Sequence, residues 1–249
     1  MEACLPGAAR PGRGWLVEAV VESGRHVTSP AGAEEPAAWI FDLDGTLVNT
    51  VETRIVAWLR TFEEFGIPAT RAAVAKLIGS DGRRLASVVA EAADRDLAPE
   101  ATEEIDRRAG DIYSELNTDP RPLPGAVELL QTLDESQVRW AIATSSRREQ
   151  VDASVRALRL SSRPIIIDGS NVERAKPAPD LLLFAARQLG VEPSRSRYVG
   201  DSVWDMQAAV AAGMPAIGVV SGSASAAELA EAGAFLTVKE LTELIPPKP

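Results

Sequence analysis

Apolar residues along the chain recur in two patterns, short strand-like runs and longer segments with helical spacing. The strand-like runs begin near residues 39, 138, 165, 197, 215 and 235. Several of them end abruptly at hydroxyl or carboxylate residues, and from the second run onward the intervening segments have helical spacing. This alternation predicts an α/β fold, a Rossmann-like three-layer core built on a parallel sheet.

Residues 51–121 interrupt the alternation, because helical spacing continues there without a strand pattern. Asn49 and Glu52 are placed to cap the first helix of this segment. The spacing predicts further helices around residues 72–78, 84–93 and 101–116. We therefore expect a small all-helical cap domain over 51–121, inserted after the first core strand, with 37–50 and 122–249 forming the core.

Residues 1–36 differ from the rest of the chain in composition. They are rich in Ala, Gly, Pro and Glu and contain two Pro-Gly pairs, which predicts a flexible N-terminal extension. An apolar stretch around Trp15 to Val21 indicates a short hairpin or strand within it. A secretory signal is disfavoured because this stretch is short and is interrupted by Glu18.

Overall composition excludes several classes of protein and partner. The 249 residues are 45% hydrophobic and 25% charged, as in ordinary globular proteins. No apolar run is long enough to span a bilayer, so we expect a soluble, cytoplasmic protein without a membrane partner. The net charge of −10 disfavours nucleic acid, although a local cluster of cations can still attract a small phosphorylated metabolite. Monomer and homodimer both stay open.

Cysteine and histidine are each represented once, by Cys4 and His26. A single cysteine excludes an intramolecular disulfide. Because His26 lies in the N-terminal extension, histidine-dependent triads and histidine-rich zinc sites are excluded for the core. Acid and base chemistry in the core must therefore use carboxylates.

Asp42 and Asp44 follow the first core strand and are the most informative residues of the chain. Residues two apart on a strand face the same way, so both carboxylates leave the strand end together at the turn made by Gly45. Two like charges this close need a cation or a shared proton. A divalent metal satisfies that need, and such a pair facing a phosphate can act as nucleophile and general acid. The alternative is an exposed Asp-x-Asp-Gly turn.

Reactive side chains also follow two later strands and one proline-flanked loop: Thr144, Lys176, Asp201 and Asp205. Ligands of an open parallel sheet bind outside the carboxyl ends of its strands, so these residues are expected to share one crevice. Each also has a structural interpretation. Thr144 is placed to cap the next helix, Lys176 could be an exposed loop lysine, and Asp205 suits a helix first turn.

Taken in order, these residues resemble the four motifs of the haloacid dehalogenase superfamily of phosphotransferases. Asp42 and Asp44 match the first motif and Thr144 the second, whereas Lys176 matches the third. Asp201 and Asp205 match the fourth motif. The spacing is similar to that of the phosphoglycolate phosphatase and β-phosphoglucomutase-like subgroup, whose helical cap lies between the first two motifs. The resemblance covers residues 37–249 and leaves the N-terminal extension unexplained.

The resemblance implies a mechanism and a Mg²⁺ cofactor. It implies that Asp42 is the nucleophile that forms an aspartyl-phosphate, and that Asp44 is the general acid and later the base. Mg²⁺ would bind the Asp42 carboxylate, the Asp44 main-chain carbonyl and Asp201, while Asp205 supports the site through water or by holding the lysine. The phosphoryl group would be held by Gly45, Thr144, Ser145 and Lys176.

Several positions at which this sequence differs from particular members of the superfamily indicate which of their activities it has. Dehalogenases lack the second aspartate of the first motif, so Asp44 disfavours that activity. Arg83 and Arg84 follow the cap glycine turn at which phosphonatases carry a Schiff-base lysine. Arg54 stands twelve residues after Asp42, where phosphomutases similar to β-phosphoglucomutase have a histidine. These departures favour a Mg²⁺-dependent phosphatase; a sugar phosphomutase and a phospho-acceptor or binding protein without turnover are the alternatives.

Four arginines are candidates for contacting the part of the substrate away from the phosphate: Arg54, Arg83, Arg84 and Arg147. An arginine can bind a carboxylate or a second phosphate through charge-assisted hydrogen bonds, although each could equally be a solvated surface residue. The leaving group stays open among phosphoglycolate, sugar phosphates and nucleoside monophosphates.

Overall fold

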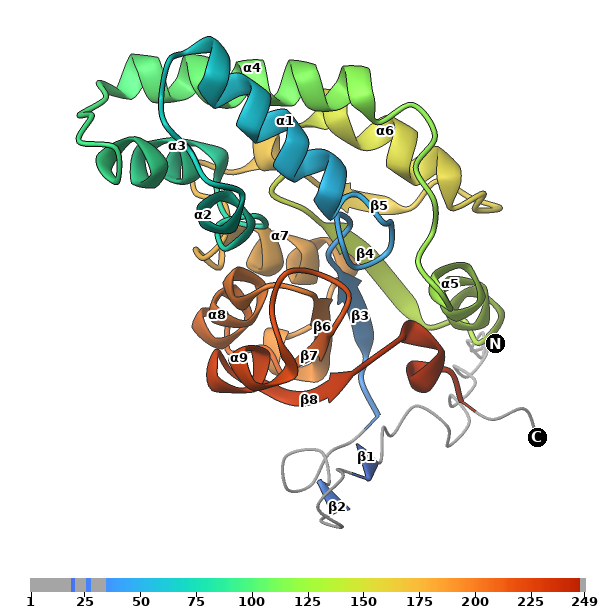
Figure 1. Ribbon diagram of the computed structural model, residues 1–249. Coiled ribbons are helices and arrows are strands. Elements are labelled where there is room, and N and C mark those ends of the chain that lie inside the picture. The colour runs from blue at the N-terminus through green and yellow to red at the C-terminus, as the bar shows by residue number, and fades with distance from the viewer. Residues whose placement is uncertain (1–18, 21–25, 28–34, 247–249) are drawn as a thin grey trace, which may run out of the picture.

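A computed structural model describes residues 19–20, 26–27 and 35–246 of the chain. Its core is a six-stranded parallel sheet with the strand order β5-β4-β3-β6-β7-β8 (Figure 1). The strands are β3 (Ala38–Phe41), β4 (Arg139–Ala143), β5 (Ile165–Ile167), β6 (Ser196–Gly200), β7 (Ala216–Val219) and β8 (Ala234–Val238). The predicted α/β class with a parallel sheet is confirmed.

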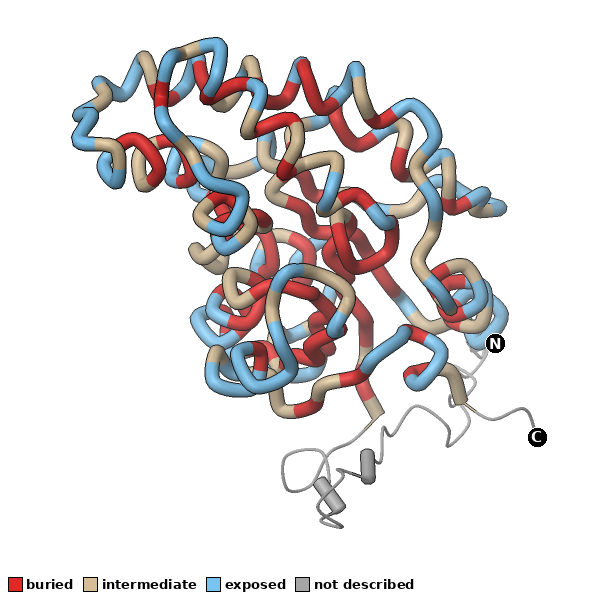
Figure 2. Tube along the Cα trace, in the orientation of Figure 1, coloured by how far each residue is buried: buried red, intermediate tan, exposed pale blue. Residues whose placement is uncertain are grey.

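Helices cover both faces of this sheet, as all-parallel sheets require. They are α5 (Ala126–Glu135), α6 (Arg148–Ala157), α7 (Asp180–Leu189), α8 (Val203–Ala211) and α9 (Ala226–Glu231), with 3₁₀ turns η1 (Gly169–Asn171), η2 (Pro193–Arg195) and η3 (Leu241–Leu244). Successive side chains of β3 pack against the helices on opposite faces of the sheet. Trp39 and Phe41 pack in a cluster with α5 and η3, whereas Ala38 and Ile40 pack with α7 and α8. Figure 2 shows the resulting buried strands at the centre of the molecule.

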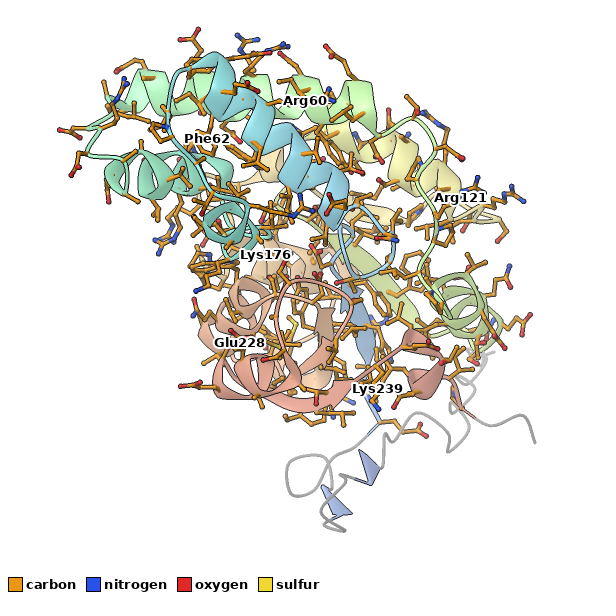
Figure 3. The ribbon with its side chains drawn as sticks, in the orientation of Figure 1. Arg60, Phe62, Arg121, Lys176, Glu228 and Lys239 are labelled. Carbon is orange, nitrogen blue, oxygen red and sulfur yellow. The ribbon has the colours of Figure 1, made fainter. Side chains whose placement is uncertain are left out.

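Four helices follow β3 directly and lie over one end of the sheet, as the expected insertion after the first core strand requires (Figure 1). They are α1 (Val51–Glu64), α2 (Arg71–Ala75), α3 (Gly82–Glu91) and α4 (Pro99–Leu116). This helical insertion has its own hydrophobic cluster, which includes Phe62, Val74, Leu85 and Ile105. Figure 3 shows Phe62 among these helices. The apolar stripe of α1 therefore serves packing.

The two connections between the core and the helical insertion lie side by side. The Asn49 amide donates to the Arg121 carbonyl at 2.8 Å, and the Leu123 amide donates to the Leu47 carbonyl at 2.9 Å. Between these bonds Val48 forms an antiparallel bridge with Pro122. The chain thus enters and leaves the insertion at the same place on the core.

The helical insertion also contacts the core away from these connections. The Asp81 amide donates to the Lys176 carbonyl at 2.8 Å, and Trp204 Nε1 donates to the Lys76 carbonyl at 3.1 Å. These bonds link the start of α3 to the loop that carries Lys176 and the end of α2 to the first turn of α8. The insertion is therefore closed over the ends of the strands.

Two short strands lie before the core, β1 (Ala19–Val20) and β2 (His26–Val27), and they pair antiparallel. β1 falls in the stretch around Trp15 to Val21 where a hairpin or strand is expected. The other residues of the predicted flexible extension, 1–36, lie outside the described residues apart from Glu35 and Pro36. In the part of the chain that the structure describes, no helix has the length and apolar character needed for a bilayer crossing.

Candidate active site

The carboxyl ends of three adjacent strands, β4, β3 and β6, bring the predicted motif residues to one edge of the sheet. Asp42 and Asp44 follow β3, and the chain then turns at Gly45, whose φ is +89°. A Cβ at Gly45 would lie 2.4 Å from Asp201 Oδ2, so a side chain here would both strain the backbone and displace that carboxylate. Glycine therefore permits the close approach of the first and fourth motifs.

Asp42, Asp201 and Asp205 form a buried acidic cluster, in which one carboxylate oxygen of each lies within 4.8 Å of the others. Burial raises the pKa of Asp42 to about 7; Lys176 opposes the rise, and the neighbouring carboxylates add to it. Burial and the charges of Asp205 and Asp42 also raise the pKa of Asp201 well above its usual range. The cluster therefore holds more negative charge than the protein itself neutralises.

Lys176 is fully buried within this cluster, between the helical insertion and the core (Figure 3). Its Nζ donates to Asp42 Oδ1 and, at 2.7 Å, to Asp205 Oδ1. Burial alone lowers the pKa of Lys176, but the two carboxylates outweigh burial and raise it, so the side chain stays charged. The interpretation of Lys176 as an exposed loop lysine is wrong.

Asp205 combines the two roles considered for it. It caps the first turn of α8, where its Oδ2 accepts hydrogen bonds from the backbone and the hydroxyl of Ser202. Its Oδ1 accepts from Tyr198 at 2.6 Å as well as from Lys176. Both oxygens are thus engaged by the protein, so Asp205 holds the lysine in place.

Asp42 and Asp201 keep oxygens that could bind a metal. Among the described residues, Asp42 Oδ2 and Asp201 Oδ2 accept no hydrogen bond, whereas Asp201 Oδ1 accepts one from Thr46 at 2.7 Å. Asp201 Oδ2 also lies close to Gly222, where a Cβ would stand 1.9 Å away. Buried, hard oxygen donors with uncompensated charge fit Mg²⁺.

The Asp44 carboxylate lies outside the acidic cluster and is held by four hydrogen bonds. Oδ1 accepts from Thr50 at 2.7 Å and from Tyr113 at 2.8 Å. Oδ2 accepts from Arg54 at 2.9 Å and from Ser146 at 2.5 Å. Burial raises the pKa of Asp44, but the Arg54 charge and the hydrogen bonds together bring it below its usual value. Asp44 is therefore ionised in this arrangement.

Arg54 is one of the four predicted selectivity residues, and the structure places it beside Asp44. Its guanidinium stacks 3.4 Å from the centroid of the Tyr113 ring, and its Nη1 donates to Gln150 Oε1 at 2.8 Å. The side chain is only 13% exposed, so the surface interpretation does not hold for it. Its hydrogen-bonding capacity is directed mainly at the protein.

Thr144 and Ser145, predicted to bind the phosphoryl group, follow β4 and line a cavity together with Asp42 and Asp44. Thr144 Oγ1 accepts from the Ser146 amide at 3.1 Å in a local turn, but it does not cap the next helix, because the N-cap of α6 is Arg147 and no side chain caps that helix. Ser145 Oγ donates to the Gly79 carbonyl at 3.2 Å. The cavity thus lies between the strand ends and the α2–α3 turn.

Arg147 lines the same cavity, where it forms an ion pair with the helical insertion. Its Nη2 donates to Asp106 Oδ2 at 2.5 Å and to Glu103 Oε1 at 2.6 Å, and both carboxylates belong to α4. Burial raises the pKa of Asp106, and the Arg147 charge opposes the rise. Arg147 thus joins α4 to the start of α6.

Arg83 and Arg84, the other two arginines predicted to contact the substrate, are not among the residues that line this cavity. Asp81 caps α3 by accepting from both of their amides, which starts the helix at Gly82. Arg83 pairs with Asp81 and with the Glu173 carbonyl. Arg84 lies 5.1 Å from the Trp204 ring.

Several residues of the site were missed by the sequence analysis, and four of them come from one face of α4 and its C-cap. Asp106, Gly110, Tyr113 and Asn117 recur at helical spacing, and each contacts a residue at or next to Asp44 or the cavity. That polar spacing was a usable signal. Other missed residues include Thr50, Trp58, Ser146 and Gln150.

The comparisons with known proteins agree with this site. Residues 39–219 match the family model of the haloacid dehalogenase-like hydrolases. The validoxylamine A 7'-phosphate phosphatase of Streptomyces hygroscopicus subsp. limoneus is 30% identical over 82% of this chain and 94% of its own length. Phosphoglycolate phosphatase 1 of Pseudomonas aeruginosa is 30% identical over 85% of this chain and 79% of its own length.

One relative is much longer than this chain. The chloroplastic protein SUPPRESSOR OF QUENCHING 1 of Arabidopsis thaliana is 32% identical over 79% of this chain, but the match spans only 19% of that protein. Among solved structures, a hydrolase from Pseudomonas syringae superposes with a TM-score of 0.80 at 32% identity, covering 83% of this chain and 95% of that one. The expected enzyme class, a phosphoric monoester hydrolase, is confirmed, and the chain belongs to the haloacid dehalogenase-like hydrolase family.

Proposed function

We propose that the chain is a Mg²⁺-dependent phosphatase that hydrolyses a small phosphorylated metabolite through an aspartyl-phosphate on Asp42. The observation that carries this proposal is the pair of opposite environments around Asp42 and Asp44. Asp42 lies in a buried acidic cluster beside Lys176, whereas Asp44 lies outside that cluster in a hydrogen-bonded pocket. The names of the relatives, which include a phosphoglycolate phosphatase, support a phosphomonoester as substrate.

The metal ligands we propose are Asp42, Asp201 and the main-chain carbonyl of Asp44. The free carboxylate oxygens of the two cluster residues support this assignment, and Asp205 keeps Lys176 in place. When bound, Mg²⁺ would reduce the repulsion between an anionic nucleophile and an anionic substrate.

In the first step, an Asp42 oxygen attacks phosphorus in line and the bond to the leaving oxygen breaks, while Asp44 gives that oxygen a proton. In the second step, Asp44 takes a proton from water, and the water oxygen attacks phosphorus. Inorganic phosphate leaves and the Asp42 carboxylate is restored. The phosphoryl oxygens are held throughout by Gly45, Thr144, Ser145 and Lys176.

The hydrogen bonds around Asp44 suit the second step as they stand, because they favour the ionised form that accepts a proton. The first step needs a protonated Asp44 and therefore a rearrangement of these bonds. Two of the donors, Arg54 and Tyr113, belong to the helical insertion, whose two chain connections to the core lie side by side. We therefore assign 51–121 the role of a cap whose movement changes the surroundings of Asp44.

The alternatives are less well supported. Arg54 pairs with Asp44 and Gln150 at the position where phosphomutases carry a histidine, and this argues against a mutase. A phospho-acceptor or binding protein without turnover would not need the acid and base that Asp44 can supply. The test is steady-state release of phosphate from a panel of phosphomonoesters, with Mg²⁺ and with EDTA.

A phosphatase releases phosphate in many turnovers, and EDTA abolishes the release. A mutase instead converts a sugar 1-phosphate to the 6-phosphate without releasing phosphate. A phospho-acceptor takes up one phosphoryl group per chain and stops. Either of these two results would replace the proposed function.

A further inference from the structure

Both arginines of the cavity lining are already paired with carboxylates of the chain. Arg54 pairs with Asp44 at 2.9 Å. Arg147 pairs with Asp106 at 2.5 Å and with Glu103 at 2.6 Å, so two carboxylates share one guanidinium. The region around Arg147 therefore carries a net negative charge, and a further anion would have to displace one of these carboxylates.

Asp106 offers a hydrogen-bond acceptor on the cavity lining. Its Oδ2 is bound by Arg147, whereas no described residue donates to its Oδ1. Oδ1 lies against Gly82, and a Cβ at that position would be only 1.8 Å from it. A residue with a side chain would therefore displace this oxygen. Both residues line the cavity. A ligand hydroxyl can donate to Oδ1, but a carboxylate cannot.

Gln150 offers a matching donor. Its Oε1 accepts from Arg54 at 2.8 Å, which sets the orientation of the side-chain amide. The other amide atom, Nε2, lies next to Gly110 and donates to no acceptor in the described part of the chain. Gln150 lines the cavity, and its Nε2 is not among the buried atoms of the described residues that lack a partner, so this donor is accessible to a ligand.

Apolar side chains complete this part of the lining. Trp58 and Leu85 come from α1 and α3, and both are buried in the insertion's hydrophobic cluster. The C–H faces of a polyol can pack against an aromatic ring while its hydroxyls bind polar groups.

We propose that the leaving group is an uncharged, polyhydroxylated alcohol, a sugar or another polyol, and that carboxylated esters are rejected. This inference rests on the proposed phosphatase function and narrows its substrate. A hydroxyl can donate to Asp106 Oδ1 and accept from Gln150 Nε2, whereas a carboxylate meets the negative region around Arg147. The sequence expectation that Arg54 or Arg147 binds an acidic group of the substrate is thereby replaced.

The test compares esters that differ in one group. The pairs are 2-hydroxyethyl phosphate with 2-phosphoglycolate and glycerol 3-phosphate with 3-phosphoglycerate, each measured as kcat/KM with Mg²⁺. We expect the hydroxylated member to exceed the carboxylated member by about tenfold or more in both pairs, because like charges placed together are strongly unfavourable. p-Nitrophenyl phosphate, which has neither group, reports on the chemistry alone.

Asp106→Asn removes the repelling charge while keeping the side-chain shape, so the preference for the hydroxylated member should fall by about fivefold or more. Asp111→Asn is the matched control, since Asp111 lies on the same helix at the surface and should leave the preference unchanged. Thermal unfolding of both variants checks that they are folded. The ratio of kcat/KM values between the hydroxylated and carboxylated esters in the wild type tests the proposal even if a variant does not fold.

Equal or better hydrolysis of the carboxylated members would overturn this inference and leave the phosphatase function intact. The inference would also be overturned, with the phosphatase function intact, if the folded Asp106→Asn variant kept the wild-type preference for the hydroxylated esters. Failure to hydrolyse any ester, p-nitrophenyl phosphate included, would overturn the proposed function and this inference together.

Discussion

Asp42 and Asp44 stand two residues apart at the end of one strand, yet they belong to two different regions of the site. Asp42 faces a core region with Lys176 and Asp201, and its pKa is raised to about 7 by burial and neighbouring carboxylates. Asp44 faces a region supplied largely by the helical insertion, and its pKa is lowered by Arg54 and by hydrogen bonds. Environment, and not residue type, thus separates the tasks that we propose for the two carboxylates.

The two regions also differ in how they are built. The core region comes from strand ends of one sheet and from the loop that carries Lys176, so its geometry follows from the sheet itself. The surroundings of Asp44 combine α1, α4 and the segment after β4. Changes to the helical insertion should therefore alter the chemistry of Asp44 and leave the metal requirement unaffected.

The largest expected effect comes from Asp42→Asn. An amide is a poor nucleophile, so turnover of p-nitrophenyl phosphate should fall by roughly 10⁵-fold or more, as for other lost nucleophiles. Steady-state phosphate release from the purified, folded variant checks this. A rate close to that of the wild type would show that Asp42 is not the nucleophile.

Asp44→Asn should have an effect that depends on the leaving group. Loss of the acid and base should lower kcat/KM for an alkyl phosphate by about 10²–10⁴-fold. The loss should be smaller for p-nitrophenyl phosphate, whose leaving group does not need a proton. Equal losses with the two esters would contradict the acid role.

Lys176→Met tests the charge balance of the core region through stability. The substitution leaves two buried carboxylates, Asp42 and Asp205, without their cation, so the free energy of unfolding should fall by about 3–5 kcal/mol. Urea unfolding at pH 7 measures the loss. An exposed lysine replaced in the same way, Lys239→Met, is the control and should cost little. Equal stability of the two variants would mean that the cluster is neutralised in another way.

Asp201→Ala should raise the Mg²⁺ concentration that gives half-maximal activity by roughly tenfold to a hundredfold. The reason is that Asp201 Oδ2 is one of the two cluster oxygens without a described hydrogen-bond partner. A Mg²⁺ titration of activity and a direct titration of Mg²⁺ binding measure the change. If the Mg²⁺ dependence of activity and the affinity for Mg²⁺ were both unchanged, Asp201 would not be a metal ligand.

The smallest expected effect is that of Tyr113→Phe, which removes one of the four hydrogen bonds to Asp44. Because three other hydrogen bonds to Asp44 stay in place, the loss of this one should cost about 0.5–1.5 kcal/mol, which lowers kcat/KM for an alkyl phosphate by roughly three- to tenfold. The Mg²⁺ concentration for half-maximal activity should stay the same, because Tyr113 belongs to the insertion side of the site. A shift in the metal requirement would show that the two regions are not separate.

Much of the catalytic region could be predicted from the amino-acid sequence. Strand-like runs that end in Asp42, Thr144 and Asp201 predict one shared crevice, because parallel strands present their carboxyl ends at the same edge of a sheet. Likewise, the helical spacing after Val51 predicts the insertion. Both inferences depend on local periodicity and on a general rule of topology, so they need no knowledge of contacts between distant segments.

The lining of the cavity was decided by tertiary structure. Asp106 and Gln150 come from helices far apart in the sequence, and only the closure of the insertion over the core brings them to one cavity. The turn at Gly79 and Gly82 suggested that Arg83 would reach the crevice. In the structure the Asp81 cap starts α3 there, and the Arg83 side chain pairs with Asp81. The sequence by itself thus predicted the reacting groups that we propose, whereas the docking of one segment on another decided which side chains line the rest of the cavity, since such contacts leave no periodic signal.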